Sequence, residues 1–300
     1  MWTDTHIHLD AAEFGGDIQL HIDAARALGV TRWILPSVAP SNFDKVRSIA
    51  HANAGVFYAL GIHPMYVKGE DKSEQTNAAH SVNNPFDDSA LELLQSALET
   101  HKNDPKLVAV GEIGLDFFNP NQTFYEIEQQ HRFFKAQLKL AARYDLPVLL
   151  HVRRSVDEVC AALRKQPVVG GIAHAFNGSA QQAQAMIHCG MALGFGGAAT
   201  YARALQIRER LRTVPDSAIV LETDGPDIPP AWLPRSENPG DRINFPENLA
   251  RIGHELAVVR DMTVNDFAAL TQANAVRVLP KAFPPKAFPA KAFPPEATEV

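Results

Sequence analysis

The chain has 300 residues, of which 46% are hydrophobic and 21% are charged. This apolar share excludes an intrinsically disordered chain and is large enough for a substantial buried core. The net charge of −6 argues against a dedicated double-helix binder, because neutralising phosphates takes Lys and Arg. An anionic substrate would need another source of positive charge, which bound metal cations can supply.

The two cysteines, Cys160 and Cys189, are too few for a disulfide framework. No basic segment followed by an apolar run opens the sequence, and no run approaches the ~18 apolar residues of a membrane span. We therefore expect a soluble, cytoplasmic protein without membrane association and without an obligate protein partner. The sequence leaves the oligomeric state open.

Short apolar runs alternate with longer amphipathic stretches along the chain, as expected for parallel strands covered by helices. The pattern predicts strands at Trp2–His6, Arg32–Pro36, Val56–Leu60, Leu107–Val110, Pro147–Leu150, Gly171–Ala173, Ala192–Phe195 and Ala218–Leu221. It predicts helices at Ile18–Ala27, Asn42–Ala52, Ala90–His101, Phe124–Tyr144, Val156–Lys165 and Ala180–His188. Roughly eight β-then-α units in about 280 residues predict an α/β fold of the (β/α)₈ (TIM) barrel type. The rival is an open doubly wound sheet, but no Gly-rich phosphate fingerprint follows the first strand.

Two long loops and a repeat interrupt this pattern. The loops are Lys68–Ser89 and the Pro-rich segment Ile228–Asp241, which both belong on the C-terminal face of a barrel. The repeat has a period of five residues beginning with Lys281-Ala282-Phe283, and its prolines predict an extended or disordered tail. We therefore divide the chain into one barrel domain, 1–280, and a tail, 281–300. The tail is either dispensable or a docking segment, because Phe283, Phe288 and Phe293 are exposed if nothing covers them.

Polar side chains that can bind metals recur at the C-terminal ends of the predicted strands. His6 and His8 are two residues apart on one strand and so face the same side. The same placement recurs after four further strands, at Glu112, His151, His174 and Asp224. Unpaired buried charges are costly, and a shared cation removes that cost. The sequence therefore predicts a metal site at this end of the barrel.

The chemistry of these six side chains indicates which ions they hold. A mixed nitrogen and oxygen set favours Zn²⁺, Mn²⁺ or Fe²⁺ over Ca²⁺ and leaves Mg²⁺ open. Six ligands exceed the four of a closed structural zinc site. Two divalent ions about 3.5–4 Å apart that share a carboxylate fit better, and such a pair can hold a hydroxide at neutral pH.

Three further residues are candidates for substrate binding. His63, in Gly61-Ile62-His63-Pro64, is a seventh ligand, a donor to a substrate oxygen or a structural turn residue. Arg153 and Arg154 follow His151 directly and can reach a phosphate or carboxylate, or they are solvated loop residues. No Gly-x-Ser-x-Gly elbow and no cysteine at a strand end supports nucleophilic catalysis by the chain itself.

The motifs together resemble the TatD family of metal-dependent hydrolases. The similar segments are Asp4-Thr5-His6-Ile7-His8-Leu9-Asp10, Gly61-Ile62-His63-Pro64, Gly111-Glu112-Ile113-Gly114-Leu115-Asp116, Pro147-Val148-Leu149-Leu150-His151-Val152-Arg153, His174-Ala175-Phe176-Asn177-Gly178 and Leu221-Glu222-Thr223-Asp224-Gly225-Pro226. They cover residues 1–280 in family order, and Asn244-Phe245-Pro246-Glu247 resembles the YjjV-type branch of the family. Gly225, where the family has Ser or Ala, and the repeat after Leu279 depart from the pattern.

The resemblance implies a dinuclear centre in a TIM barrel. By motif position, His6, His8 and Asp224 would hold one metal, His151 and His174 the other, and Glu112 would bridge them. It also implies phosphodiester hydrolysis, typically as an exonucleolytic deoxyribonuclease. The net charge favours single-stranded DNA or another small phosphoester as substrate.

A catalytic role follows for three residues. Asp224 would take the proton of the attacking water, His63 would bind the scissile group, and Glu112 would bridge the metals. Two alternatives stay open: an ester or amide hydrolase on the same site, such as an aminoacyl-tRNA deacylase or a lactonase, and a binding or scaffold protein.

Overall fold

The computed structural model describes residues 1–67, 87–234, 238 and 242–283. In this part of the chain, parallel strands form one eight-stranded sheet whose spatial order follows the sequence. The strands are β1 (Trp2–Asp4), β2 (Val30–Pro36), β3 (Val56–Leu60), β4 (Leu107–Asp116), β5 (Val148–Arg153), β6 (Gly171–Ala173), β7 (Met191–Phe195) and β8 (Ile219–Leu221). Past their ends, Thr5 N–H donates to Leu221 O at 3.0 Å and Asp224 N–H donates to His6 O at 2.9 Å. These bonds join the first strand to the last, and the predicted TIM barrel is confirmed.

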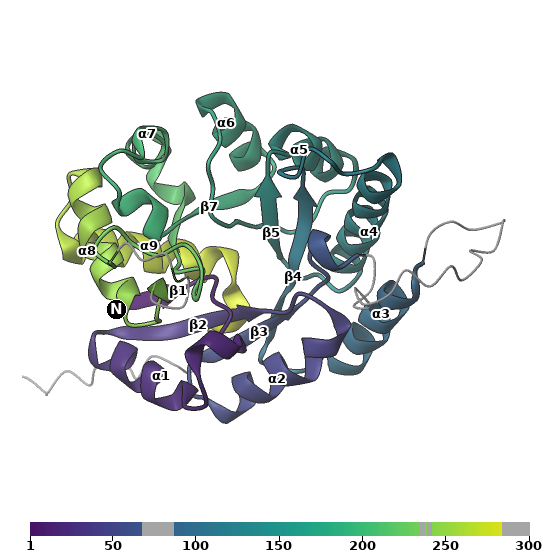
Figure 1. Cartoon of the computed structure of the whole chain (residues 1–300), viewed down its shortest axis with the longest axis horizontal. Helices are drawn as coiled ribbons and strands as arrows, with labels where there is room; N and C mark the ends of the chain where they lie inside the picture. Colours follow the sequence, from purple (N-terminus) through teal and green to yellow (C-terminus); the bar gives the residue numbers. More distant parts are fainter. Residues whose placement is uncertain (68–86, 235–237, 239–241, 284–300) are drawn as a thin grey trace, which may run out of the picture.

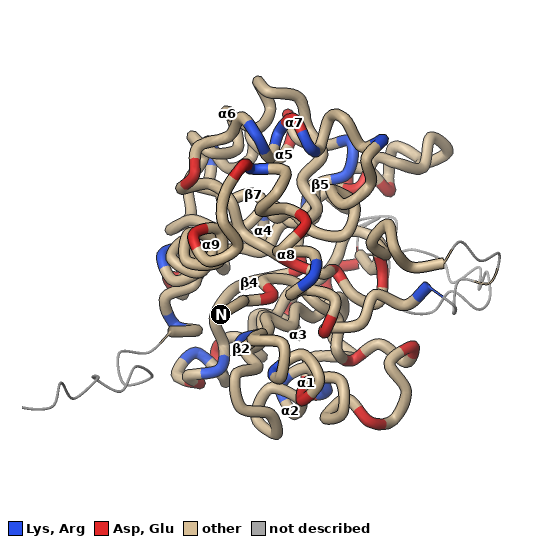
Figure 2. Tube along the Cα trace, turned by 90° about the vertical axis from the view of Figure 1, so that its left-hand side faces the viewer, with Lys and Arg blue, Asp and Glu red and all other residues tan. Residues whose placement is uncertain are grey.

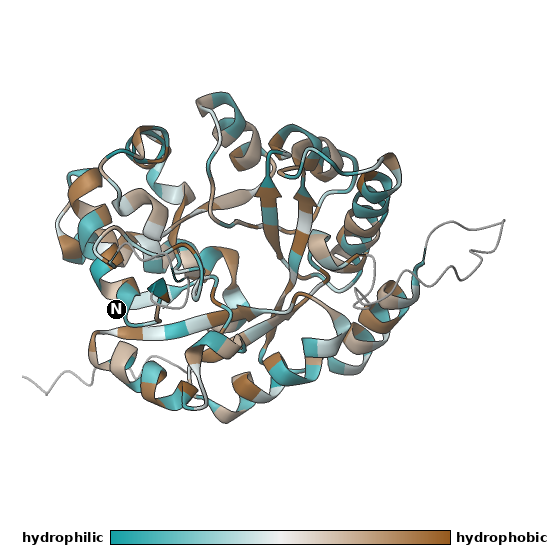
Figure 3. Cartoon of the chain, in the orientation of Figure 1, coloured by the Kyte–Doolittle hydropathy of each residue, from teal (hydrophilic) through white to brown (hydrophobic). Residues whose placement is uncertain are grey.

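Helices surround the sheet (Figure 1). They are α1 (Ile18–Ala27), α2 (Phe43–Ala52), α3 (Ser89–His101), α4 (Phe124–Arg143), α5 (Val156–Lys165), α6 (Ala180–His188), α7 (Leu205–Thr213), α8 (Asn248–Arg260) and α9 (Val264–Val278). Local sequence fixes several of their starts, as in α4, where Thr123 and Glu126 form a reciprocal capping box. Hydrophilic and hydrophobic residues alternate around the helix ribbons (Figure 3), as amphipathic helices on a sheet require.

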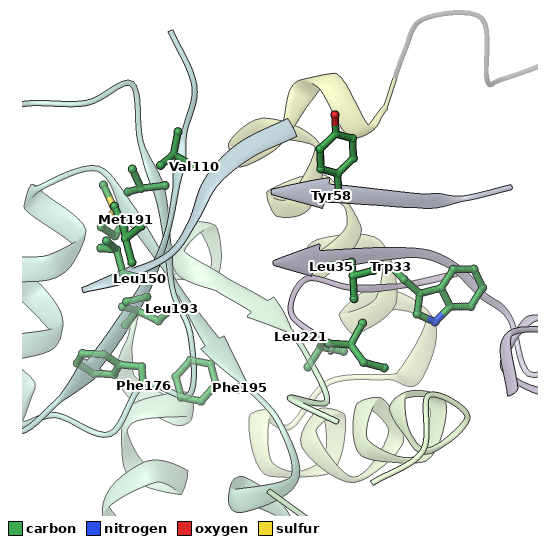
Figure 4. Close-up of a cluster of buried hydrophobic side chains, with 14 of the residues drawn as sticks. Trp33, Leu35, Tyr58, Val110, Leu150, Phe176, Met191, Leu193, Phe195 and Leu221 are labelled. Carbon is green, nitrogen blue, oxygen red and sulfur yellow. The ribbon is translucent and has the colours of Figure 1, made fainter. Parts of the chain in front are cut away.

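The core has two parts because successive strand residues point to opposite faces of the sheet. Trp33 and Leu35 of β2 belong to a large cluster that packs the outer face against the helices (Figure 4). Ile34, between them, belongs to a second cluster with Leu149 and Ile172, which fills the barrel interior. The interior is therefore packed, which leaves the rim of the barrel for a site.

The second cluster continues into the first repeat of the predicted tail. Pro280–Ala282 forms a 3₁₀ helix, and Phe283 is buried against residues of the barrel interior. Arg32, early in β2, donates from Nε to Ala282 O at 2.9 Å and places Cζ 4.5 Å from the Phe283 ring centre. Phe283 thus covers the N-terminal end of the barrel, and the barrel itself buries this first Phe of the repeat.

The division at residue 280 stays a prediction. Residues 284–300, with Phe288 and Phe293, lie outside the described residues, as does most of the predicted loop Lys68–Ser89. Of the predicted loop Ile228–Asp241, residues 235–237 and 239–241 also lie outside them.

Three predicted strand ends need correction. β1 ends at Asp4, so His6 and His8 lie in the segment after it, where Thr5 bonds to the β8 side and Ile7 N–H donates to Ile34 O of β2. β4 and β5 continue past their predicted ends, so Glu112 and His151 lie within strands. β4 and β5 are longer than predicted because polar residues facing a site do not interrupt backbone pairing.

Figure 2 shows Lys and Arg segments interspersed with Asp and Glu segments over the outer helices. No helix in the described ranges is long and apolar enough to cross a bilayer.

Candidate metal centre

Glu112 lies at the centre of a group of histidines at the C-terminal rim of the barrel. Its Oε2 atom is 3.2 Å from Nε2 of His6 and 3.5 Å from Nε2 of His8. Its Oε1 atom is 2.8 Å from Nε2 of His174 and 2.9 Å from Nδ1 of His151. The two oxygens of one carboxylate therefore face two different pairs of imidazoles.

Asp224 completes the group from the segment after β8. Its Oδ1 atom is 3.5 Å from Nε2 of His6 and 3.7 Å from Nδ1 of His174. Its backbone is left-handed, with φ of 56°, and its N–H donates to the carbonyl of His6. The structure thus brings together all of the side chains that were expected to bind metal: His6, His8, Glu112, His151, His174 and Asp224.

The spacing of these atoms suits divalent cations. Neighbouring ligand atoms around an ion held at ~2.0–2.2 Å lie about 3–3.5 Å apart, and the contacts to Glu112 fall at or near this range. Three groups of potential ligand atoms lie within 4.8 Å of one another: His6, Glu112 and His174; His6, His8 and Asp224; His63, Glu112 and His151. Imidazole nitrogens and carboxylate oxygens are the donor set of Zn²⁺ and Mn²⁺. The residues present therefore fit a metal centre.

Burial and mutual contact shift the pKa values in this cluster. Burial, together with the neighbouring His174, lowers the pKa of His6 to about 3. Burial would also lower the pKa of His174, but Glu112 and Asp224 outweigh it and raise that pKa to about 10. Burial would raise the pKa of Glu112, but the neighbouring histidines, His174 first among them, outweigh burial and hold it well below the ordinary value. Glu112 is therefore an anion, the form that can bind a cation.

His63 differs from the other histidines in the hydrogen bond that it accepts. Its Nε2 atom is 3.4 Å from Glu112 Oε1, while its Nδ1 atom accepts the backbone N–H of Met65 at 3.1 Å. Burial lowers the pKa of His63, which favours the neutral ring. A neutral imidazole that accepts at Nδ1 carries its proton on Nε2. The Nε2 atom of His63 is then a hydrogen-bond donor without a free lone pair for an ion.

Asp116 is a contact of the cluster that we did not predict. Its Oδ2 atom is 3.0 Å from Nε2 of His151, on the other side of that ring from Glu112. A carboxylate that accepts from the distal ring nitrogen fixes the orientation of a metal-binding histidine. The sequence contains a signal for this contact. Asp116 follows Glu112 by an even number of residues on one strand, so both side chains point to the same face.

Asp4 is a second unpredicted contact, and it ties the two ends of the sheet together. Its buried carboxylate accepts from the backbone N–H of Thr223 at 3.0 Å and from its hydroxyl at 2.7 Å. It also accepts from His6 N–H at 3.3 Å. Burial raises the pKa of Asp4 to about 7. The segments that carry His6 and Asp224 are thereby held side by side.

Glu222 lies beneath His174. Its Oε1 atom accepts the backbone N–H of Ala175 at 2.5 Å and is 4.0 Å from Nδ1 of His174. Burial raises the pKa of Glu222 to about 8. A Cβ atom at Gly194 would overlap this carboxylate, so β7 leaves the space that Glu222 fills. Glu222 is positioned to orient the His174 segment.

Arg153 and Arg154 lie beside the histidines. Nη1 of Arg153 is 3.9 Å from Asp116 Oδ2. Both guanidinium groups lie over the ring of Phe118, with Cζ 3.7 Å and 4.7 Å from its centre. The two arginines thus flank the cluster as cations at its rim.

The barrel and this rim cluster define a metal-dependent hydrolase. The family model described as "TatD related DNase" matches residues 3–280. The chain belongs to this family.

The names of similar proteins are of two kinds, metal-dependent hydrolase and exonuclease. It is 36% identical over 266 residues to the "uncharacterized metal-dependent hydrolase YjjV" of Escherichia coli K12, covering 88% of this chain and 92% of that protein. The crystal structure of E. coli YjjV has a TM-score of 0.80, with 34% identity over 93% of this chain and 98% of that one. The Salmonella typhimurium protein named "3'-5' ssDNA/RNA exonuclease TatD" is 30% identical over 275 residues, which cover 91% and 96% of the two chains.

Proposed function

We propose that this protein is a phosphodiesterase that hydrolyses single-stranded DNA from its ends, with a dinuclear metal centre. The single observation that carries the proposal is the position of Glu112, whose two oxygens face separate pairs of histidines. A carboxylate placed in this way suits a bridge between two ions. The exonuclease name of the Salmonella relative supports the choice of substrate.

In this proposal, each of the six candidate ligand residues is assigned to one ion, to the other ion or to the position between them. His6, His8 and Asp224 would hold one ion, and His151 and His174 would hold the other. Glu112 would lie between the two ions, which would be Zn²⁺, Mn²⁺ or Mg²⁺. When bound, such ions make water acidic enough to react at neutral pH and neutralise charge on a phosphoryl oxygen.

The residues of the chain then orient the reactants and move the proton. Asp224 accepts the proton of the attacking water as the new phosphorus–oxygen bond forms, and it passes that proton to the leaving oxygen as the old phosphorus–oxygen bond breaks. His63 donates from Nε2 to an oxygen of the scissile phosphate. Arg153 and Arg154 bind a phosphate at the rim, where their guanidinium groups are accessible.

The test is a hydrolysis screen on protein reconstituted with one metal at a time. The substrates are single-stranded DNA, duplex DNA, RNA, simple phosphoesters, lactones and aminoacyl-tRNA. We expect cleavage of single-stranded DNA that is lost with a chelator and restored by one of the three ions. Turnover of lactones or acyl esters alone would overturn the proposal and favour an ester hydrolase on the same residues.

A further inference from the structure

Phe118 is an exposed aromatic residue, 46% accessible, on the turn that follows β4. Its backbone N–H donates to Oδ1 of Asp116 at 2.8 Å. The other oxygen of that carboxylate is 3.0 Å from Nε2 of His151. One carboxylate therefore fixes both the turn that carries the exposed ring and a histidine of the cluster.

This turn is held by further hydrogen bonds. The backbone N–H of Asp116 donates to Oε1 of Gln130 at 2.8 Å, and its carbonyl accepts from Gln130 Nε2 at 3.1 Å. The same carbonyl accepts from Gln122 Nε2 at 2.9 Å. A ring on a turn fixed in this way loses little conformational freedom when a flat ligand stacks on it.

A lone exposed aromatic ring needs no explanation, but Phe118 is associated with two cations. Arg153 and Arg154 place Cζ 3.7 Å and 4.7 Å from its ring centre. Both follow His151 in the chain, so the ring and the guanidinium groups adjoin the cluster from two neighbouring strands. Aromatic rings with arginines beside them are how proteins bind the bases and phosphates of single strands.

We propose that Phe118, with Arg153 against it, is the surface on which a nucleobase next to the scissile phosphodiester stacks. This rests on the proposed hydrolysis of single-stranded DNA and names the contact that recognises it. Stacking accepts any base, so it selects an unpaired strand that carries bases without reading its sequence. A DNA strand without a base at this position keeps its phosphate contacts with the protein and loses the stacking contact with Phe118.

Binding can be tested apart from turnover. Chelator-treated protein is titrated into single-stranded DNA with 2-aminopurine at one of its terminal positions, because the fluorescence of this base falls when it stacks. We expect quenching at one position by the natural protein and by Phe118→Trp, and its loss in Phe118→Leu. The control is Phe124→Leu, since Phe124 is also exposed and has no cation–π contact in the described part of the chain.

Turnover supplies the second measurement. With metal restored, Phe118→Leu should raise KM for single-stranded DNA about tenfold, the order found for loss of one stacked base. On DNA with an abasic nucleotide at the quenched position, the natural protein and Phe118→Leu should have equal KM. Thermal unfolding of each variant checks that its fold is kept.

The outcomes separate the two proposals. A natural protein that quenches the probe but cleaves no DNA with any metal would overturn the proposed function. Cleavage with the same KM and the same quenching in Phe118→Leu would overturn the stacking role. An equal rise of KM on normal and abasic DNA would also overturn it, because Phe118 would then act only through the shape of the turn.

Discussion

Oδ2 of Asp116 lies 3.0 Å from Nε2 of His151, while Nδ1 of the same ring lies 2.9 Å from Glu112. If Nδ1 binds an ion, Asp116 keeps the proton on Nε2 and holds the ring in place. Replacing Asp116 with Asn should weaken metal binding by about 10–100-fold, the usual effect of losing such a partner. Titration against a competing chelator measures this, and an unchanged metal affinity would contradict the role.

Glu112→Gln is the sharpest test of the bridge. The substitution keeps the size of the side chain but removes the charge that two ions would share. We expect loss of one or both ions per chain in elemental analysis and loss of hydrolysis. A variant that keeps two ions and full activity would refute the bridging position.

His63 can be assigned as donor or ligand by measuring metal and rate together. Because Nδ1 of His63 accepts the Met65 N–H, we expect Nε2 to donate to substrate. His63→Ala should lower kcat by about 10²-fold or more, the usual order for loss of one hydrogen-bond donor to a reacting oxygen. Metal content should stay that of the natural protein, whereas a fall to one ion would make His63 a ligand.

Phe283 should contribute to stability from the far end of the barrel. It is buried in the interior cluster and lies under Arg32. Phe283→Ala should lower the free energy of unfolding by about 3 kcal/mol, the low end for truncating a buried Phe. Urea denaturation measures the change, with the exposed Phe124→Ala as control. Equal effects in the two variants would show that burial of Phe283 is unimportant.

Asp104 should make stability depend on acid pH. Burial alone would raise its pKa, but hydrogen bonds from His51 and Lys106 outweigh burial and hold the pKa below the ordinary value. A folded-state pKa below the unfolded one stabilises the fold above ~pH 4 and loses this effect as pH falls through the folded-state value. The stability difference between the natural protein and Asp104→Asn should therefore shrink in acid. A difference that stays constant between pH 7 and pH 3 would contradict this.

The cluster was predictable because the topology is regular. Parallel strands in sequence order bring their C-terminal ends to one rim, so residues as distant as His6 and Asp224 meet there. Strand ends were less predictable, since Glu112 and His151 lie within strands that stay paired up to the rim. Polar residues indicate where the site lies, whereas backbone hydrogen bonding between strands decides where each strand ends.

Other features left weak signals in the sequence. The α7 helix buries Leu211 among charged residues, so its apolar pattern is faint. The repeat that begins at Lys281 suggests an extended chain, and only the three-dimensional fold shows that Phe283 finds a buried place at the barrel end. The contacts of Asp4 and Asp116 depend on side-chain directions that composition does not reveal.

The hydrogen bonds between Asp4 and Thr223 span 219 residues of sequence. During synthesis, Asp4 at the end of the first strand therefore has no Thr223 to bind until 223 of the 300 residues have been made. Until the first and last strands pair, His6 and Asp224 lie apart, and an incomplete chain does not have the full group of candidate metal ligands. The six candidate ligand side chains therefore come together only at the final stage of barrel formation.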